Sequence, residues 1–137
     1  MAENSRTSAA ALAEVVRGRR SIDLFESAPI AHDVLLEAID VARWAPNHRL
    51  TEPWRFWLIG PKTRESLISL AVAIDTAAKG ERAGAARRER LSAVPGFFVL
   101  TSSRNSDALT EREDYGACWC AGQNLMLYLW QRGVGVK

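Results

Sequence analysis

The sequence predicts an α+β fold, because helical segments dominate, two short strands stand far apart, and a long apolar helix lies near the end. The strands are expected at 54–59 and 97–101, with a long helical stretch between them. That order differs from the regular alternation of a βαβ series. The long helix, 109–131, is apolar on nearly every side from Tyr115 onward, so we expect it to be buried as the core of the fold.

Two helices are expected before the first strand. Residues 8–18 carry apolar side chains at helical spacing, with Gly18 as the stop signal. A second helix begins at Asp33 and continues to Pro46, which ends it because proline lacks the amide donor. Residues 49–53 are expected to form a loop that leads into the strand.

The remaining elements are separated by glycine and proline. Segment 54–59 is aromatic and β-branched, typical of a strand, and Gly60-Pro61 closes it. Gly133 is expected to cap the long helix. Between the first strand and the long helix, the expected elements are helix 63–79, the highly charged helix or frayed helix end 81–92, and strand 97–101.

Composition indicates one soluble globular domain spanning residues 1–137, with residues 1–7 as a disordered tail. The chain has 137 residues, 47% of them hydrophobic and 25% charged, which excludes an intrinsically disordered protein. Its net charge of +2 gives no electrostatic reason to expect nucleic acid as the main partner. The most apolar stretch, 115–130, is interrupted by polar residues and is too short for a membrane span, so no membrane partner is expected.

The cysteines favour a reducing compartment. Cys118 and Cys120 are the only two, and no signal peptide precedes them, so the expected location is the cytoplasm. At this spacing they point to nearly opposite sides of a helix and cannot share a metal or a disulfide. We expect both to be buried small apolar residues. No metal site is expected, because His48 and His32 are the only histidines and the cysteines lie far along the chain.

Two short segments carry candidate binding residues. Arg19, Arg20 and Ser21 offer paired guanidinium donors and a hydroxyl, which suit a phosphate or the polar edge of a flavin ring. Taken alone, such a cluster is more often a cationic helix end that complements the helix dipole and has no other role. The second comprises 44–48 and 51–56, where two prolines fix a loop between a helix and a strand as a rigid mount for binding residues. His48 on this loop can donate a hydrogen bond to a ligand, although a loop histidine alone is more often a surface residue.

The order of these motifs resembles the FMN-dependent nitroreductase family, in particular its small branch with an Ala-Pro-Asp/Asn-His loop. The similarity extends from about Val15 to the last residue. Each motif alone is weak, whereas their order and spacing together are fairly specific. The motifs are Arg19-Arg20-Ser21, Ala45-Pro46-Asn47-His48, Glu52-Pro53-Trp54-Arg55-Phe56, Glu113-Asp114-Tyr115, Gln123-Asn124-Leu125 and Gly133-Val134-Gly135.

The resemblance implies a nitroreductase-like α+β fold, with a central, mostly antiparallel sheet flanked by helices around the long core helix. It also implies a homodimer with FMN in the interface, touched by both chains. Family members pass a hydride from NADH or NADPH to the flavin N5 and then to a nitro compound, quinone or similar small-molecule acceptor, in a ping-pong cycle. The flavin carries the chemistry, so no catalytic acid–base pair is expected in the protein.

By position, the resemblance implies that Arg19, Arg20 and Ser21 contact the phosphate, ribityl chain and pyrimidine edge of FMN. It places His48 beside the flavin, from the partner chain's side. Three neighbours of His48 in the same loop are expected to line the site with it, namely Trp44, Pro46 and Asn47.

The sequence also departs from the family pattern. Family chains continue after Gly135 into a further strand, helix and tail, so about a quarter of the expected domain is absent. The sequence is therefore expected to be either a fragment or the product of a truncated gene. One alternative is therefore a non-catalytic interaction protein that keeps the dimer surface but lacks the flavin site. A second alternative is a related flavin-fold enzyme with another reaction, such as dehalogenation or flavin breakdown.

Overall fold

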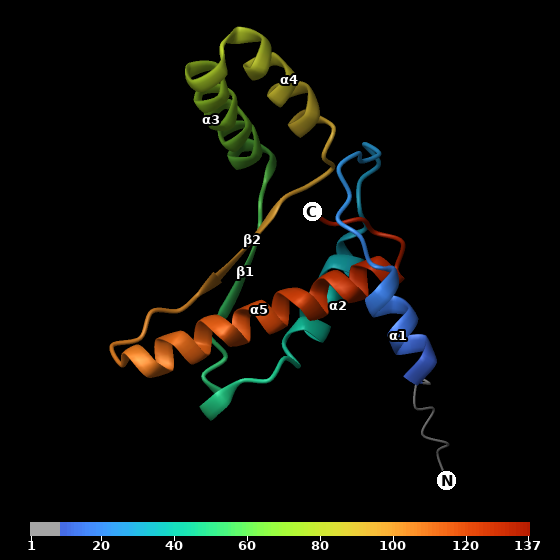
Figure 1. Ribbon diagram of the computed structural model, residues 1–137, viewed down its shortest axis with the longest axis vertical. Coiled ribbons are helices and arrows are strands. Elements are labelled where there is room, and N and C mark those ends of the chain that lie inside the picture. The colour runs from blue at the N-terminus through green and yellow to red at the C-terminus, as the bar shows by residue number, and fades with distance from the viewer. Residues whose placement is uncertain (1–8) are drawn as a thin grey trace.

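The computed structural model describes residues 9–137, and within them it contains five α-helices, one short 3₁₀ turn and two strands (Figure 1). The predicted tail, 1–7, lies outside the described residues. The elements in chain order are α1 (Ala9–Gly18), α2 (His32–Ala42), the 3₁₀ turn η1 (His48–Leu50), β1 (Trp54–Leu58), α3 (Pro61–Lys79), α4 (Glu81–Ser92), β2 (Phe98–Ser102) and α5 (Ala108–Gln131).

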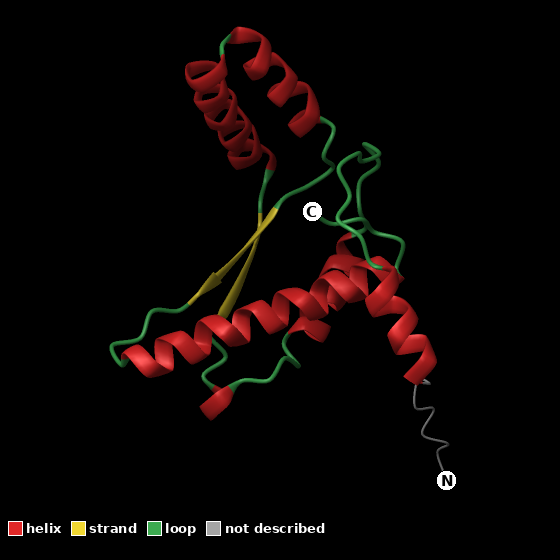
Figure 2. Cartoon of the chain, viewed as in Figure 1, coloured by secondary structure: helices red, strands yellow, loops and turns green. Residues whose placement is uncertain are grey.

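Helix α5 is the element on which the other parts of the chain are arranged (Figure 1). Helix α2 packs along its C-terminal half, the two strands cross its middle, and α1 lies beside its C-terminal end. The α3–α4 hairpin extends away from α5 at the far end of the strands (Figure 2). None of the helices in the described part of the chain is long and apolar enough to cross a membrane.

The strands form an antiparallel pair in which Trp54 lies opposite Ser102 and Leu58 lies opposite Phe98. Because the α3–α4 hairpin connects them, they are far apart in sequence although adjacent in space (Figure 2). Helices and an antiparallel sheet in separate segments of the chain confirm the predicted α+β class.

The α3–α4 hairpin is held by close contact and by charge pairs. Gly80 turns the chain with a φ of 87°, which glycine adopts without steric cost. Gly84 packs so tightly on α3 that a Cβ there would lie 1.9 Å from Oγ1 of Thr76. Between the two helices, Arg87 donates to Asp75 at 2.6 Å, which lowers the pKa of that carboxyl. The bounds of α3 and α4 confirm the helices predicted at 63–79 and 81–92.

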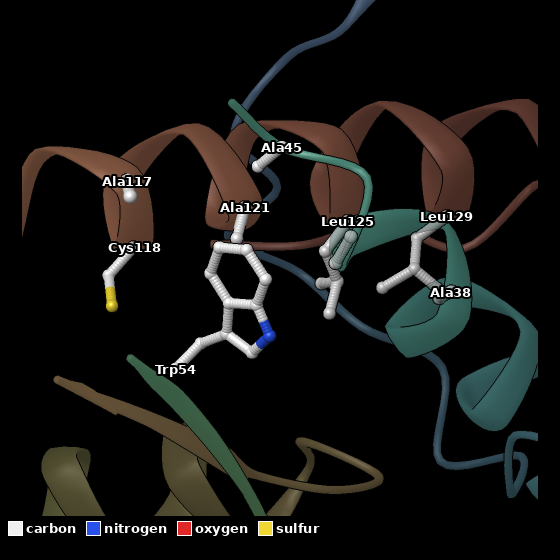
Figure 3. Packing of buried hydrophobic residues seen from close by; sticks show 9 residues of the cluster. Ala38, Ala45, Trp54, Ala117, Cys118, Ala121, Leu125 and Leu129 are labelled. Carbon is white, nitrogen blue, oxygen red and sulfur yellow. The ribbon is translucent and has the colours of Figure 1, made fainter. Parts of the chain in front are cut away.

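The core is built from small side chains of α2 and α5 and from Trp54 of β1 (Figure 3). Ala38 is fully buried against Leu129, and the indole of Trp54 lies beneath Ala121. Alanine at these positions lets the helices approach closely, so that Leu125 fills the space between them. The buried cluster comprises Ala38, Ala42, Ala45, Trp54, Ala117, Cys118, Ala121, Leu125 and Leu129.

The end of α5 is a Schellman turn, as the predicted Gly133 cap requires. Gly133 has a φ of 74° and its amide donates to the carbonyl of Trp130, while the amide of Val134 donates to that of Leu129 at 2.8 Å. The chain then returns toward α1, where Val136 pairs with Ser21 in an isolated parallel bridge.

The structure corrects three details of the sequence analysis. Helix α2 ends at Ala42 and not at Pro46, because the residue before a proline disfavours the α conformation, and Trp44 and Ala45 close a tighter turn. Helix α5 is buried along one face only, with Trp119 63% exposed. Of the two cysteines, Cys118 is buried and Cys120 is exposed.

Candidate functional site

The loop of residues 47–52, hereafter the 47–52 loop, carries His48 and is shaped by the side chain of Asn47. The Asn47 Oδ1 accepts from the amide of Glu52 at 2.7 Å, and its Nδ2 donates to Oγ1 of Thr51 at 3.0 Å. Both ends of the amide are therefore engaged inside the loop. Asn47, predicted as a cofactor-binding residue, holds the backbone that presents His48.

The backbone of the 47–52 loop is unusual. Arg49, Leu50 and Glu52 have φ values of 63°, 52° and 44°, in the left-handed region that residues other than glycine rarely adopt. Such conformations persist only where surrounding contacts fix them, and they are concentrated at functional sites. The conformation of this loop therefore depends on the contacts that surround it.

Two contacts fix the loop to the first half of α5. The hydroxyl of Thr51 donates to Oδ1 of Asp114, a carboxylate that is only 3% exposed. Nη1 of Arg49 donates to Oγ1 of Thr110 at 3.2 Å. Thr110 in turn bonds Asp107, the N-cap of α5, through its hydroxyl and its amide, and these bonds lower the pKa of the Asp107 carboxyl. Sequence analysis attached no role to Thr51 or Thr110.

The remaining predicted residues of this region face solvent. Trp44 is 83% exposed, and Pro46 and His48 are exposed as well. Ala45 between them is buried in the core and fixes the path of the loop against α5. An exposed indole and an exposed imidazole on a fixed backbone are available to a ligand or a second protein chain.

Arg19, Arg20 and Ser21 follow α1 and lie beside the C-terminal end of α5. Ser21 pairs with Val136, and Nη1 of Arg20 donates to the carbonyls of Arg17 at 2.6 Å and Arg19 at 2.9 Å, which caps the end of α1. Arg19 is half-buried as a residue, and within residues 9–137 its guanidinium has neither a hydrogen-bond nor an ion-pair partner. Arg19 is therefore free to bind an anion, whereas Arg20 is already engaged.

The two predicted clusters do not meet within one chain. The 47–52 loop is bonded to Asp114, whereas Arg19–Ser21 lie near Trp130 and the turn after it. The helix between Asp114 and Trp130 is about 24 Å long at a rise of about 1.5 Å per residue. The two clusters therefore lie toward opposite ends of α5 in the same chain.

Two open grooves lie elsewhere on the surface. One, of about 650 Å³, is mostly apolar and runs between the segment after Ser21 and the end of α5, with Ile22, Trp130 and Arg132 in its wall. The other lies between β2 and the first turns of α5, beside Tyr115. Neither groove is lined by Arg19, by His48 or by the other predicted site residues.

The described residues gather no three His, Cys, Asp or Glu side chains that could hold a metal ion. Burial raises the pKa of the Cys118 thiol, which keeps it protonated and unreactive at neutral pH. The candidate site therefore consists of cationic and aromatic side chains on the surface and contains no buried nucleophile.

Comparison with known proteins identifies the family. The family model described as "Nitroreductase family" matches residues 16–136. The chain belongs to the nitroreductase family. It is 32% identical over 129 residues to the Bacillus subtilis (strain 168) protein named "Putative NAD(P)H nitroreductase YfhC", which covers 91% of the chain and 66% of the relative. A 56-residue segment is 34% identical to 4-nitrobenzoate reductase of Pseudomonas putida, covering 41% of the chain and 25% of that enzyme.

Solved structures share the fold of this nitroreductase-family chain. The nitroreductase-like family protein from Bacillus cereus superimposes with a TM-score of 0.79 at 28% identity, covering 96% of the chain and 70% of that protein. The FMN-dependent nitroreductase NfnB from Mycobacterium smegmatis, solved in complex with NADPH, gives a TM-score of 0.71 at 18% identity, with 93% of the chain and 73% of NfnB covered. These matches confirm the predicted family and the nitroreductase-like fold.

Proposed function

We propose that this oxidoreductase is FMN-dependent and transfers a hydride from NADH or NADPH, through the flavin, to a nitro compound, quinone or similar acceptor. The observation that carries the proposal is the family match across residues 16–136. The chain spans 66% of the length of the Bacillus subtilis relative, and the residues of its own candidate site add to the support from the family match. The cytoplasm is the expected compartment, because both thiols are free.

The residues present fit an FMN phosphate at the Arg19–Ser21 cluster. The guanidinium of Arg19 is unpaired within residues 9–137, and a phosphate supplies the paired oxygens that such a group binds. Ser21 adds a hydroxyl at a position that its bridge to Val136 fixes. Arg20 contributes through the cap that holds the end of α1 in place.

The 47–52 loop supplies the other side of the proposed site. The contacts of this loop fix its backbone. His48 projects from the loop and Trp44 from the turn before it, and neither side chain is paired with another described side chain. An imidazole N–H can donate to a flavin carbonyl, and an exposed indole can cover an aromatic ring. Together they would orient the ring and exclude water from one of its faces.

A homodimer would bring the Arg19–Ser21 cluster of one chain close to the 47–52 loop of the other. Helix α5 exposes two aromatic side chains one turn apart, Tyr115 and Trp119, which are 57% and 63% exposed and whose ring centroids lie 6.1 Å apart. Exposed apolar patches of this kind mark interaction surfaces. In an antiparallel pairing of two α5 helices that sets Asp114 of one copy beside Trp130 of the other, the 47–52 loop of one chain would approach Arg19–Ser21 of its partner.

FMN, when bound, supplies the chemistry by accepting a hydride from the nicotinamide and passing it to the acceptor. The chain's residues bind and orient the cofactor. Arg19 and Ser21 anchor its phosphate end, and His48 and Trp44 flank its ring. In this proposal no side chain has to exchange a proton for the hydride transfer itself.

Titration of the purified protein with FMN tests the proposal. We expect bound flavin absorbance in the visible range and quenched flavin fluorescence, followed by bleaching of that absorbance when NADH or NADPH is added without air. A protein that neither retains FMN on purification nor binds it on addition would exclude the flavin function and favour a binding protein of the same fold.

A further inference from the structure

Asn47, Thr51 and Asp114 form one continuous chain of hydrogen bonds. Nδ2 of Asn47 donates to Oγ1 of Thr51 at 3.0 Å, and the same hydroxyl donates its own proton to Oδ1 of Asp114. A hydroxyl has one proton to donate and lone pairs to accept with, so Thr51 can serve both neighbours at once. Bonds linked in this way polarise and strengthen one another.

We propose that this Asn47–Thr51–Asp114 chain is the latch that fixes the 47–52 loop and thereby positions His48. Its consequence for the cofactor rests on the proposed flavin function. Asn47 also closes the loop through the amide of Glu52, so the latch controls both ends of the segment in which the left-handed residues lie. These three residues are positioning residues, because they act on the ligand through His48.

Burial of Asp114 makes the latch rigid. Its carboxylate is 3% exposed and lies on α5, in the helix that carries most of the core. A buried carboxylate is costly unless it accepts hydrogen bonds, so it holds the Thr51 hydroxyl in one place. Asp114 is thus held in place by the core, and the exposed loop residue Thr51 is positioned by its hydrogen bond to Asp114.

The strained backbone explains why the loop needs a latch. Arg49 and Leu50 adopt left-handed conformations that the isolated segment would leave. Without the latch, the remaining side-chain tie to α5 is the 3.2 Å bond from Arg49 to Thr110. We expect the segment then to populate other conformations, in which His48 no longer occupies a single position.

Thr51→Val and Thr51→Ser form a matched pair for the test. Valine keeps the β-branched shape and removes the hydroxyl, whereas serine keeps the hydroxyl and removes a methyl group. Thr51 is exposed, so neither change disturbs the core. Limited trypsin digestion of the protein without FMN then reports on loop order, because cleavage after Arg49 needs the loop to open. Cleavage after Arg82, in α4, serves as the internal reference.

We expect Thr51→Val to raise the relative rate of cleavage after Arg49 about tenfold, as loss of a bond to a buried carboxylate allows. Thr51→Ser should leave that rate unchanged. Titration with FMN should show weaker binding for Thr51→Val and wild-type binding for Thr51→Ser. Equal cleavage in Thr51→Val and wild type would overturn the latch, and faster cleavage with unchanged FMN affinity would overturn its link to the cofactor.

The same experiment separates this inference from the proposed function. If Thr51→Val opens the loop but the wild-type protein does not bind FMN, the latch stands and the flavin function fails. If the wild type binds FMN and neither measurement distinguishes Thr51→Val from it, the flavin function stands and the latch fails.

Discussion

Thr51 donates its hydroxyl proton to the carboxylate of Asp114, although 63 positions separate the two residues in the sequence. This bond joins an exposed loop to the buried face of α5. It fixes where His48 lies, at the end of α5 opposite to Arg19. The separation of these two candidate binding residues within one chain is what makes a site shared by two chains the simplest arrangement.

Replacement of Arg19 tests the proposed phosphate anchor. We expect Arg19→Ala to weaken FMN binding by more than about 1.5 kcal/mol, or about tenfold, because a charged hydrogen bond is lost. Arg17→Ala is the matched control, since Arg17 lies in the last turn of α1 and leaves the cluster intact. Isothermal titration with FMN measures both, and equal affinities would remove Arg19 from the site.

Replacement of Trp119 tests the proposed dimer face. Trp119→Arg places a charge beside the exposed Tyr115 on α5, so we expect sedimentation velocity to show a monomer, in contrast to the dimer proposed for the wild type. Ile74→Arg is the control, because Ile74 is 59% exposed on α3, away from α5. A dimer that survives Trp119→Arg and dissociates in Ile74→Arg would place the interface on the hairpin instead.

The contact between α2 and α5 should make stability depend on pH. The Tyr128 hydroxyl and the Arg132 guanidinium donate to Glu37 and lower the pKa of its carboxyl. A lowered folded pKa contributes stability that is fully present above the unfolded value of about 4.3 and is lost as pH falls through the folded pKa. We therefore expect the fall in Tm below about pH 4.5 to be shallower in Glu37→Gln than in wild type.

Asp40→Asn on the same helix is the control for that pH series. Asp40 forms only a 3.6 Å pair with Arg43, and both side chains are largely exposed, so its removal should leave the slope unchanged. A Glu37→Gln protein whose Tm follows the wild-type curve at every pH would show that this cluster does not contribute to the acid sensitivity.

The core around α5 should be sensitive to truncation. Leu129 is 1% exposed and packs against Ala38 of α2, so we expect Leu129→Ala to lower the free energy of unfolding by about 2–5 kcal/mol. Leu70→Ala, at a 58% exposed position of α3, should change it by less than about 0.5 kcal/mol. Urea unfolding followed by circular dichroism measures both, and similar losses would contradict the assigned core.

The helices of the hairpin were predictable because local signals define them. Gly60-Pro61 and Gly80 interrupt the chain at the ends of α3, and proline and glycine act through their own backbone geometry. The Schellman turn at Gly133 was predictable for the same reason. In these places the sequence signal and the structure depend on the same few neighbouring residues.

Other features were beyond sequence reasoning, because they depend on contacts between distant segments. Sequence alone does not distinguish an apolar side chain that its own chain buries from one that a second chain covers. The exposed face of α5, which includes Trp119, is therefore wrongly predicted as core. The bonds from the Asn47 side chain to Thr51 and to the amide of Glu52 depend on the folded path of the loop, which the sequence does not define. No local pattern pairs Thr51 with Asp114.

The shared site can be tested most directly in a hybrid dimer made from Arg19→Ala and His48→Ala chains with different affinity tags. If each site takes Arg19 from one chain and His48 from its partner, the hybrid contains one site with both changes and one intact site. We expect it to bind one FMN per dimer with wild-type affinity, while each parent dimer binds FMN weakly. A hybrid that binds FMN as weakly as both parents would contradict a site built from two chains.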